Sequence, residues 1–157
     1  MNKYLATILY CTFVFNAQAQ KHIYQGTYRI GGKSQESAYQ LLTIHCEKQG
    51  AIFFYLEVGR GAPNYNSGAK YGRLMLNKQN GHLQYLPIDT MEDCSLEFIK
   101  NGSKITVKTI HGDCPFGYGV YADGDYSIKS SFNPVYFTDR HRHKIYFSKT
   151  PPENYLE

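Results

Sequence analysis

Few residues in this sequence form a pattern that could do chemistry. Residues 31–34 (Gly-Gly-Lys-Ser) match only the end of a phosphate-binding loop, because Thr27 occupies a position where that motif needs glycine. His141 and His143 would share a face of an extended segment and could ligate a metal, yet no third ligand is evident. An exposed basic edge that deters strand pairing is the alternative. The sequence therefore predicts a protein that is not an enzyme and has neither a cofactor nor a metal site.

A long loop rich in glycine and tyrosine is the first candidate for molecular recognition. It covers residues 59–70 and ends at Tyr71, which is long for a connection in a small β domain. Loops of this kind often carry binding residues, and tyrosine offers a large contact area at a low entropic cost. The alternative is a flexible polar loop with incidental tyrosines. The predicted binding residues are Tyr65, Ser67, Lys70 and Tyr71.

A second glycine-rich segment, residues 114–126, is the other candidate for recognition, and a structural corner is the favoured interpretation. Pro115 and three glycines indicate a path on which the backbone turns sharply. We expect Phe116 and Val120 to close one end of the fold. No binding residue is predicted in this segment.

The first 19 residues have the pattern of a secretory signal peptide. Lys3 precedes an apolar stretch over residues 5–15, and Ala17-Gln18-Ala19 forms a small-x-small cleavage site. The apolar run is about half of the roughly 20 residues that span a bilayer, so we expect no stable membrane anchor. Cys11 would be a poor lipid attachment site because the bulky Tyr10 precedes it. The sequence predicts a periplasmic or secreted protein with a single domain over residues 20–157.

Export favours a disulfide among the three cysteines that remain after cleavage. Cys94 and Cys114 flank a predicted hairpin, so we predict that they form the bridge. Cys46 alternates with apolar neighbours and is expected to be a buried, inert thiol, although a bridge between two copies is an open alternative. Paired C-x-x-C spacing is absent, which argues against a zinc site.

Short runs with strand character fill the rest of the chain. Aromatic residues make up 15% of the sequence and charged residues only 19%, which favours β structure over a helical bundle. The runs cover residues 23–30, 39–46, 51–58, 71–76, 82–88, 94–100, 104–110, 119–121, 126–129 and 144–148. They predict an all-β fold, an antiparallel meander of about eight or nine strands that forms a small barrel or a two-sheet sandwich.

The period-two pattern also predicts which side chains face the core. The two clearest hairpins turn at Lys48-Gln49-Gly50 and at Asn101-Gly102. Their expected inward residues are Leu42, Ile44, Cys46, Phe54, Leu56, Val58, Leu96, Phe98, Ile105 and Val107.

Two resemblances add to these patterns. Ser67-Gly68-Ala69-Lys70-Tyr71 resembles the S-G-x-x-Y loop of bacterial periplasmic lysozyme inhibitors, which are small exported β proteins that often carry a disulfide. The resemblance implies that Ser67 and Tyr71 enter the cleft of a lysozyme and hydrogen-bond its catalytic carboxylates. Residues 114–126 also resemble a group of small exported bacterial proteins with the pattern C-x-F-G-x-x-V-x-A-x-G-x-Y, which implies fold and export but no activity.

The function expected from the sequence is therefore binding. The leading hypothesis is an exported non-catalytic protein that inhibits a lysozyme or another cell-wall hydrolase through the loop at 59–71. The alternative is a lipocalin-like carrier of a small apolar molecule, suggested by the abundance of Phe and Tyr. A formal net charge of only +4 and the predicted export argue against nucleic acid as a partner.

Overall fold

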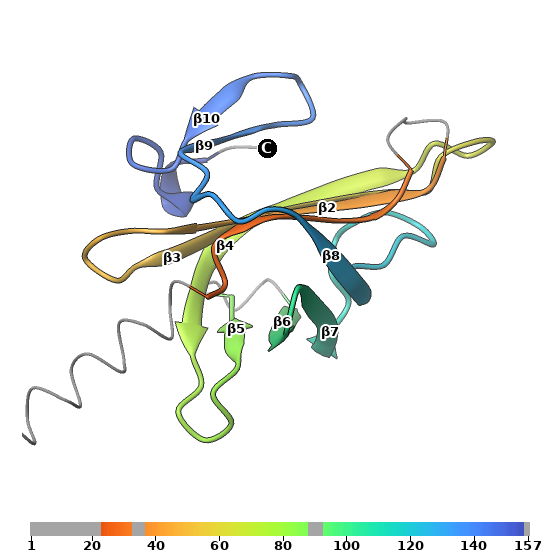
Figure 1. Cartoon of the computed structure of the whole chain (residues 1–157). Coiled ribbons are helices and arrows are strands. Elements are labelled where there is room, and N and C mark those ends of the chain that lie inside the picture. Colours follow the sequence, from red (N-terminus) through yellow and green to blue (C-terminus); the bar gives the residue numbers. More distant parts are fainter. Residues whose placement is uncertain (1–22, 33–36, 88–92, 156–157) are drawn as a thin grey trace, which may run out of the picture.

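Eight antiparallel strands close into a barrel, and a separate two-stranded sheet lies outside it (Figure 1). The computed structural model describes residues 23–32, 37–87 and 93–155, so the predicted leader lies outside the described residues. The barrel strands are β1 (Gly26–Gly31), β2 (Tyr39–Cys46), β3 (Ile52–Gly59), β4 (Ser67–Leu76), β5 (Leu83–Tyr85), β6 (Cys94–Asn101), β7 (Lys104–Gly112) and β8 (Gly124–Ser130). The outer sheet contains β9 (Tyr136–Thr138) and β10 (Lys144–Tyr146), and a 3-10 turn, η1 (Pro152–Asn154), follows.

The predicted all-β meander is confirmed, and its form is a barrel. Each strand pairs with its neighbour in sequence, and β8 returns to pair with β1, which closes the ring. Four expected strands differ clearly from the structure. Residues 119–121 form part of a loop, residues 82–88 contribute only the short β5, residues 144–148 contribute only the short β10 of the outer sheet, and β4 begins at Ser67 rather than at Tyr71. In the described part of the chain, no helix has the length and apolarity to cross a membrane.

The barrel interior is filled by the side chains that the period-two pattern selected. All ten predicted inward residues are buried members of a single core cluster. Tyr28 and Tyr126 are also fully buried there, and each phenol group donates a hydrogen bond to a backbone carbonyl oxygen. Burial raises the pKa of both phenols, so they remain neutral donors. The predicted burial of Cys46 is confirmed.

A second core covers the outer face of β2, β3 and β4. It consists of the buried residues Phe53, Tyr55, Ala69, Tyr71, Phe137 and Phe147. Residues 131–155, here called the C-terminal segment, supply the covering half and include β9 and β10, which Figure 1 shows above β2 and β3. Asn133 anchors the start of this segment, because its side chain exchanges two hydrogen bonds with the backbone of Cys46. The three central strands of this face are therefore buried on both sides.

One end of the barrel carries its most elaborate connections. The strands β1, β3, β5 and β7 end there, and β2, β4, β6 and β8 begin there. Two loops at this end are described in full: residues 60–66, which join β3 to β4, and residues 113–123, which join β7 to β8. We call this end the mouth and these two segments the mouth loops.

Candidate functional site

The predicted binding loop is shorter than the sequence indicated. Ser67, Gly68, Ala69 and Lys70 pair in register with β3, so they belong to β4, and only residues 60–66 form the connection. The expectation that 59–70 is one long loop is therefore wrong. Residues 67–70 are mostly small and lack the alternation of apolar and polar residues that predicts a strand. Their strand conformation follows from the pairing with β3. Consequently the S-G-x-x-Y pentad lies on a strand and does not protrude.

The four predicted binding residues are not brought together on one surface. Tyr71 is only 6% exposed, lies in the outer core and donates a hydrogen bond to Thr150 O at 2.7 Å. Burial and neighbouring carboxylates raise the pKa of its phenol group. Lys70 alternates with Tyr71 along β4, and its Nζ lies 5.3 Å from the centre of the Tyr85 ring. Ser67 Oγ accepts a hydrogen bond from Arg140, so of the four only Tyr65, at 58% exposure, has a side chain largely in solvent.

The loop that carries Tyr65 is held in a compact form by its own backbone. The N–H of Arg60 donates to Asn66 O at 2.9 Å, and the N–H of Tyr65 donates to Gly61 O at 2.8 Å. Tyr65 has a φ of 50°, in the left-handed region that a residue other than glycine seldom adopts. The loop therefore presents its tyrosine on a defined turn at the mouth.

The loop at 113–123 is anchored from below and exposes two tyrosines. The predicted disulfide is confirmed, since Cys94 at the start of β6 is bonded to Cys114 at a sulfur–sulfur distance of 2.06 Å. Phe116 and Val120 are buried in the barrel core, as the sequence predicted. Tyr118, which lies between these two residues in sequence, is 88% exposed, and Tyr121, which follows Val120, is 73% exposed. An anchored backbone thus carries the two most exposed tyrosines of the described chain.

Hydrogen bonds connect this loop to its surroundings. The Asn66 side chain donates to Tyr118 O at 2.9 Å, which ties the two mouth loops together. The Gln40 side chain, at the start of β2, donates to Tyr121 O, also at 2.9 Å. The backbone carbonyl of each exposed tyrosine is therefore held by another part of the barrel, while the phenol ring extends away from it.

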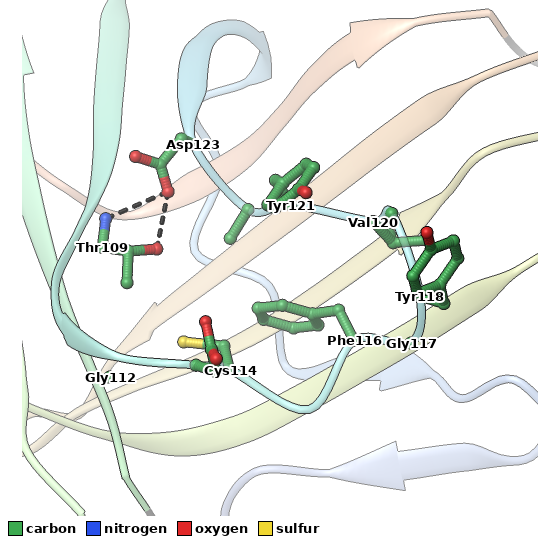
Figure 2. Close-up of a pocket in the computed structure, with 12 residues that line it drawn as sticks. Thr109, Gly112, Cys114, Phe116, Gly117, Tyr118, Val120, Tyr121 and Asp123 are labelled. Atoms are coloured by element: carbon green, nitrogen blue, oxygen red, sulfur yellow. Dashed lines mark hydrogen bonds between the residues drawn. The ribbon is translucent and has the colours of Figure 1, made fainter.

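A pocket of about 600 Å³ lies against the second mouth loop (Figure 2). Asp113 and Asp123 line it, and its described lining residues include no lysine or arginine. Asp123 Oδ1 accepts hydrogen bonds from the backbone N–H of Thr109 at 3.0 Å and from its hydroxyl at 2.6 Å, as Figure 2 shows. Phe116 and Val120 add apolar surface. The mouth thus combines exposed aromatic rings with a hollow lined by two carboxylates, and the Arg60 guanidinium group lies against Gly119 of the same loop.

The fit between β4 and this loop depends on a glycine. A Cβ atom on Gly68 would lie 2.4 Å from Phe116 Cα and 2.6 Å from Phe116 O, and backbone atoms cannot give way as a flexible side chain can. We expect Gly68→Ala to lower the free energy of unfolding by about 3 kcal/mol, because it forces the loop off the barrel. Urea denaturation measures this loss. Gly102→Ala is the control, since nothing lies within 4 Å of its Cβ, and it should cost about 1 kcal/mol through its left-handed φ alone. Equal losses in the two variants would contradict the close approach.

Tyr118 and Tyr121 were not among the predicted binding residues, because the glycines and the proline of the second loop favoured a structural role for it. The signal that could have found Tyr118 is its position between Gly117 and Gly119, where small flanking residues leave the ring uncovered. Within residues 23–32, 37–87 and 93–155, no cluster of three or more His, Cys, Asp or Glu side chains could hold a metal ion.

Comparisons of this chain with protein-family models, with curated proteins and with solved structures gave no match.

Proposed function

We propose that this protein is an exported, non-catalytic binding protein that engages a protein partner through the mouth loops. The observation that carries the proposal is the presentation of Tyr118 and Tyr121 on a loop fixed by a disulfide and by two buried side chains. A pre-ordered loop loses little conformational entropy on docking, so more of the contact energy remains as affinity. Exposed tyrosines supply apolar area and a hydroxyl group in the same side chain.

The proposed partner is a lysozyme or another cell-wall hydrolase. Lysozymes are usually cationic, and the carboxylates of Asp113 and Asp123 offer local charge complementarity at the mouth of a chain whose formal net charge is +4. The S-G-x-x-Y resemblance supports the same class of partner, but Tyr71 is covered by the C-terminal segment. We therefore assign the contact to the mouth loops, with Tyr65, Tyr118 and Tyr121 at its centre.

Clearance of a cell-wall suspension by lysozyme, followed by turbidity, tests this proposal. The mature chain should slow the clearance, and the double variant Tyr118→Ala/Tyr121→Ala should weaken inhibition about 30-fold or more, as expected for two central aromatic contacts. Phe132→Ala is the matched control, because Phe132 is also an exposed aromatic residue (84%) but lies away from the mouth. Its neighbour Asn133 bonds to the backbone of Cys46, at the end of β2 that is opposite the mouth. Inhibition by Phe132→Ala should equal that of the wild type.

Two results would contradict the proposal. Lack of inhibition across several lysozyme classes would reject the partner class. Inhibition that survives the double substitution at Tyr118 and Tyr121 would reject the mouth as the contact surface.

The carrier hypothesis is the second candidate, and the volume of the mouth pocket favours it. About 600 Å³ lies within the range of small-molecule sites. The barrel axis is occupied by large buried side chains such as Phe54, Phe98 and Tyr126, so a ligand would bind at the mouth. Native mass spectrometry of the purified protein should then detect a retained small molecule, whereas a protein-binding module should give the mass of the bare chain.

A further inference from the structure

The outer sheet turns one face toward the barrel and the other toward solvent. Phe137 and Ile145 lie on the inner face, in the second core, while Tyr136 and Tyr146 lie opposite each other on the outer face. The two tyrosine ring centres are 5.6 Å apart. The hairpin is therefore a fixed platform, because its apolar side is already packed.

Each of these tyrosines holds a lysine ammonium group over its ring. Lys144 Nζ lies 4.9 Å from the centre of the Tyr136 ring, and Lys149 Nζ lies 5.3 Å from the centre of the Tyr146 ring. A cation over an aromatic face is attracted by the ring quadrupole and loses part of its freedom. Both charges therefore lie over rings whose centres are 5.6 Å apart. We call Tyr136, Lys144, Tyr146 and Lys149 the cationic face.

Further positive charge lies on the same hairpin, and both acidic residues of the segment have partners of their own. Arg142 lies exposed in the turn between β9 and β10. Asp139 is buried and accepts a hydrogen bond from the backbone N–H of His143 at 2.7 Å. Glu153 pairs with Arg73 on β4 at 3.6 Å. Residues 131–155 include no other Asp or Glu, so this surface keeps a positive excess.

We propose that the cationic face binds an acidic polysaccharide, a chain that carries carboxylate or sulfate groups on successive sugars. Several cations on one rigid face suit a polyvalent anion, because each additional contact forms at a high effective concentration. The tyrosine rings and hydroxyl groups beside the ammonium groups offer the apolar and polar contacts that a sugar needs. None of the four residues of the cationic face belongs to the mouth loops, and the proposal does not depend on the function proposed for those loops.

An anionic membrane is the competing source of negative charge. A segment that lies in a bilayer interface buries a broad apolar face there. In this hairpin the apolar face, with Phe137 and Ile145, is already packed against the barrel. Phe132 and Val135 are exposed beside the hairpin, so the experiment includes a vesicle arm.

Isothermal titration of the mature chain tests the proposal. The probes are alginate and heparin oligosaccharides, neutral dextran, and vesicles of phosphatidylglycerol with phosphatidylcholine, all at about 50 mM salt so that screening is weak. We expect binding to at least one acidic oligosaccharide and none to dextran. Lys144→Gln/Lys149→Gln should weaken that binding about 10-fold, whereas Lys104→Gln/Lys108→Gln, the same change of charge on the exposed face of β7, should weaken it less than about 2-fold.

Three outcomes would overturn the proposal. One is the absence of heat with both acidic oligosaccharides. Another is an equal loss of affinity in the two double-lysine variants, which would show that net charge alone drives binding. The third is tighter binding to the anionic vesicles than to either oligosaccharide, which would assign the face to a membrane.

Discussion

Replacing Cys94 and Cys114 together by alanine is expected to lower the free energy of unfolding by about 3 kcal/mol. The disulfide joins residues 20 apart in sequence, and without it the unfolded chain regains the entropy of an open loop of that length. Urea denaturation followed by circular dichroism measures the change, and thermal unfolding should begin about 10 °C lower. The loop at 113–123 would also lose its covalent anchor to β6, so the proposed inhibition of lysozyme should be weaker in this variant.

A thiol reductant provides the control for this experiment, and Cys46 stays in place throughout. Cys46 is buried at the end of β2 and takes no part in the bridge, so it is kept in both proteins. Adding a thiol reductant to the wild type should reproduce the loss, and adding it to the double-alanine variant should change nothing. The free energy of unfolding can be compared between the double-alanine variant and the wild type, and between the wild type with and without reductant. A decrease below about 1 kcal/mol in both cases would mean that the bridge adds little to the stability of the barrel.

The second large effect is expected at Phe147, which fastens the C-terminal segment to the barrel. Its ring stacks on His45 with centres 4.8 Å apart and packs against Phe137 and Tyr71. Phe147→Ala should cost about 3 to 5 kcal/mol of local stability, which is enough to release the segment from the outer face of β2, β3 and β4. Amide hydrogen exchange should then accelerate in β9 and β10 while the barrel strands that do not touch the segment keep their protection.

Tyr136→Ala is the matched control for that variant. Tyr136 lies on the same hairpin but faces away from the barrel, so its removal should leave the exchange of the outer sheet nearly unchanged. Similar exchange in wild type and Phe147→Ala would show that the second core does not hold the segment. Loss of protection throughout the barrel would show that barrel and segment unfold as one unit.

Much of the barrel could be predicted from the sequence because its physical signals are local. The alternation of apolar residues in β2, β6 and β7 selects the inward side chains, and Asn101-Gly102 supplies the left-handed turn of a tight hairpin. Barrel and sandwich differ only in the long-range pairing of β8 with β1, which no local pattern encodes.

The second core was missed although its signal is present in β3. Residues 52–56 are apolar at every position, and a strand that is apolar on both parities is buried on both faces. The inward parity alone accounts for Phe54 and Leu56 but gives no packing partner to Phe53 and Tyr55. Their partners, Phe137 and Phe147, come from a distant segment whose weak strand pattern gave no indication of where it packs.

The candidate site was predicted only in part for a similar reason. The resemblance at residues 67–71 directed attention to β4, where the strand pairing and the C-terminal segment cover Tyr71. Exposure of Tyr118 and Tyr121 depends on how Phe116 and Val120 plug the barrel, which is a tertiary property. The plug itself was predicted from its composition, but the surface that the plug creates was not.

Amide hydrogen exchange of the protein, alone and with saturating lysozyme, tests the central claim most directly. The account predicts slower exchange in residues 60–66 and 113–123 when lysozyme is bound, because docking covers both mouth loops. Exchange in β9 and β10, and in the turn at 77–82 at the opposite end of the barrel, should not change. Protection confined to regions outside the mouth, or no protection at all, would contradict the account.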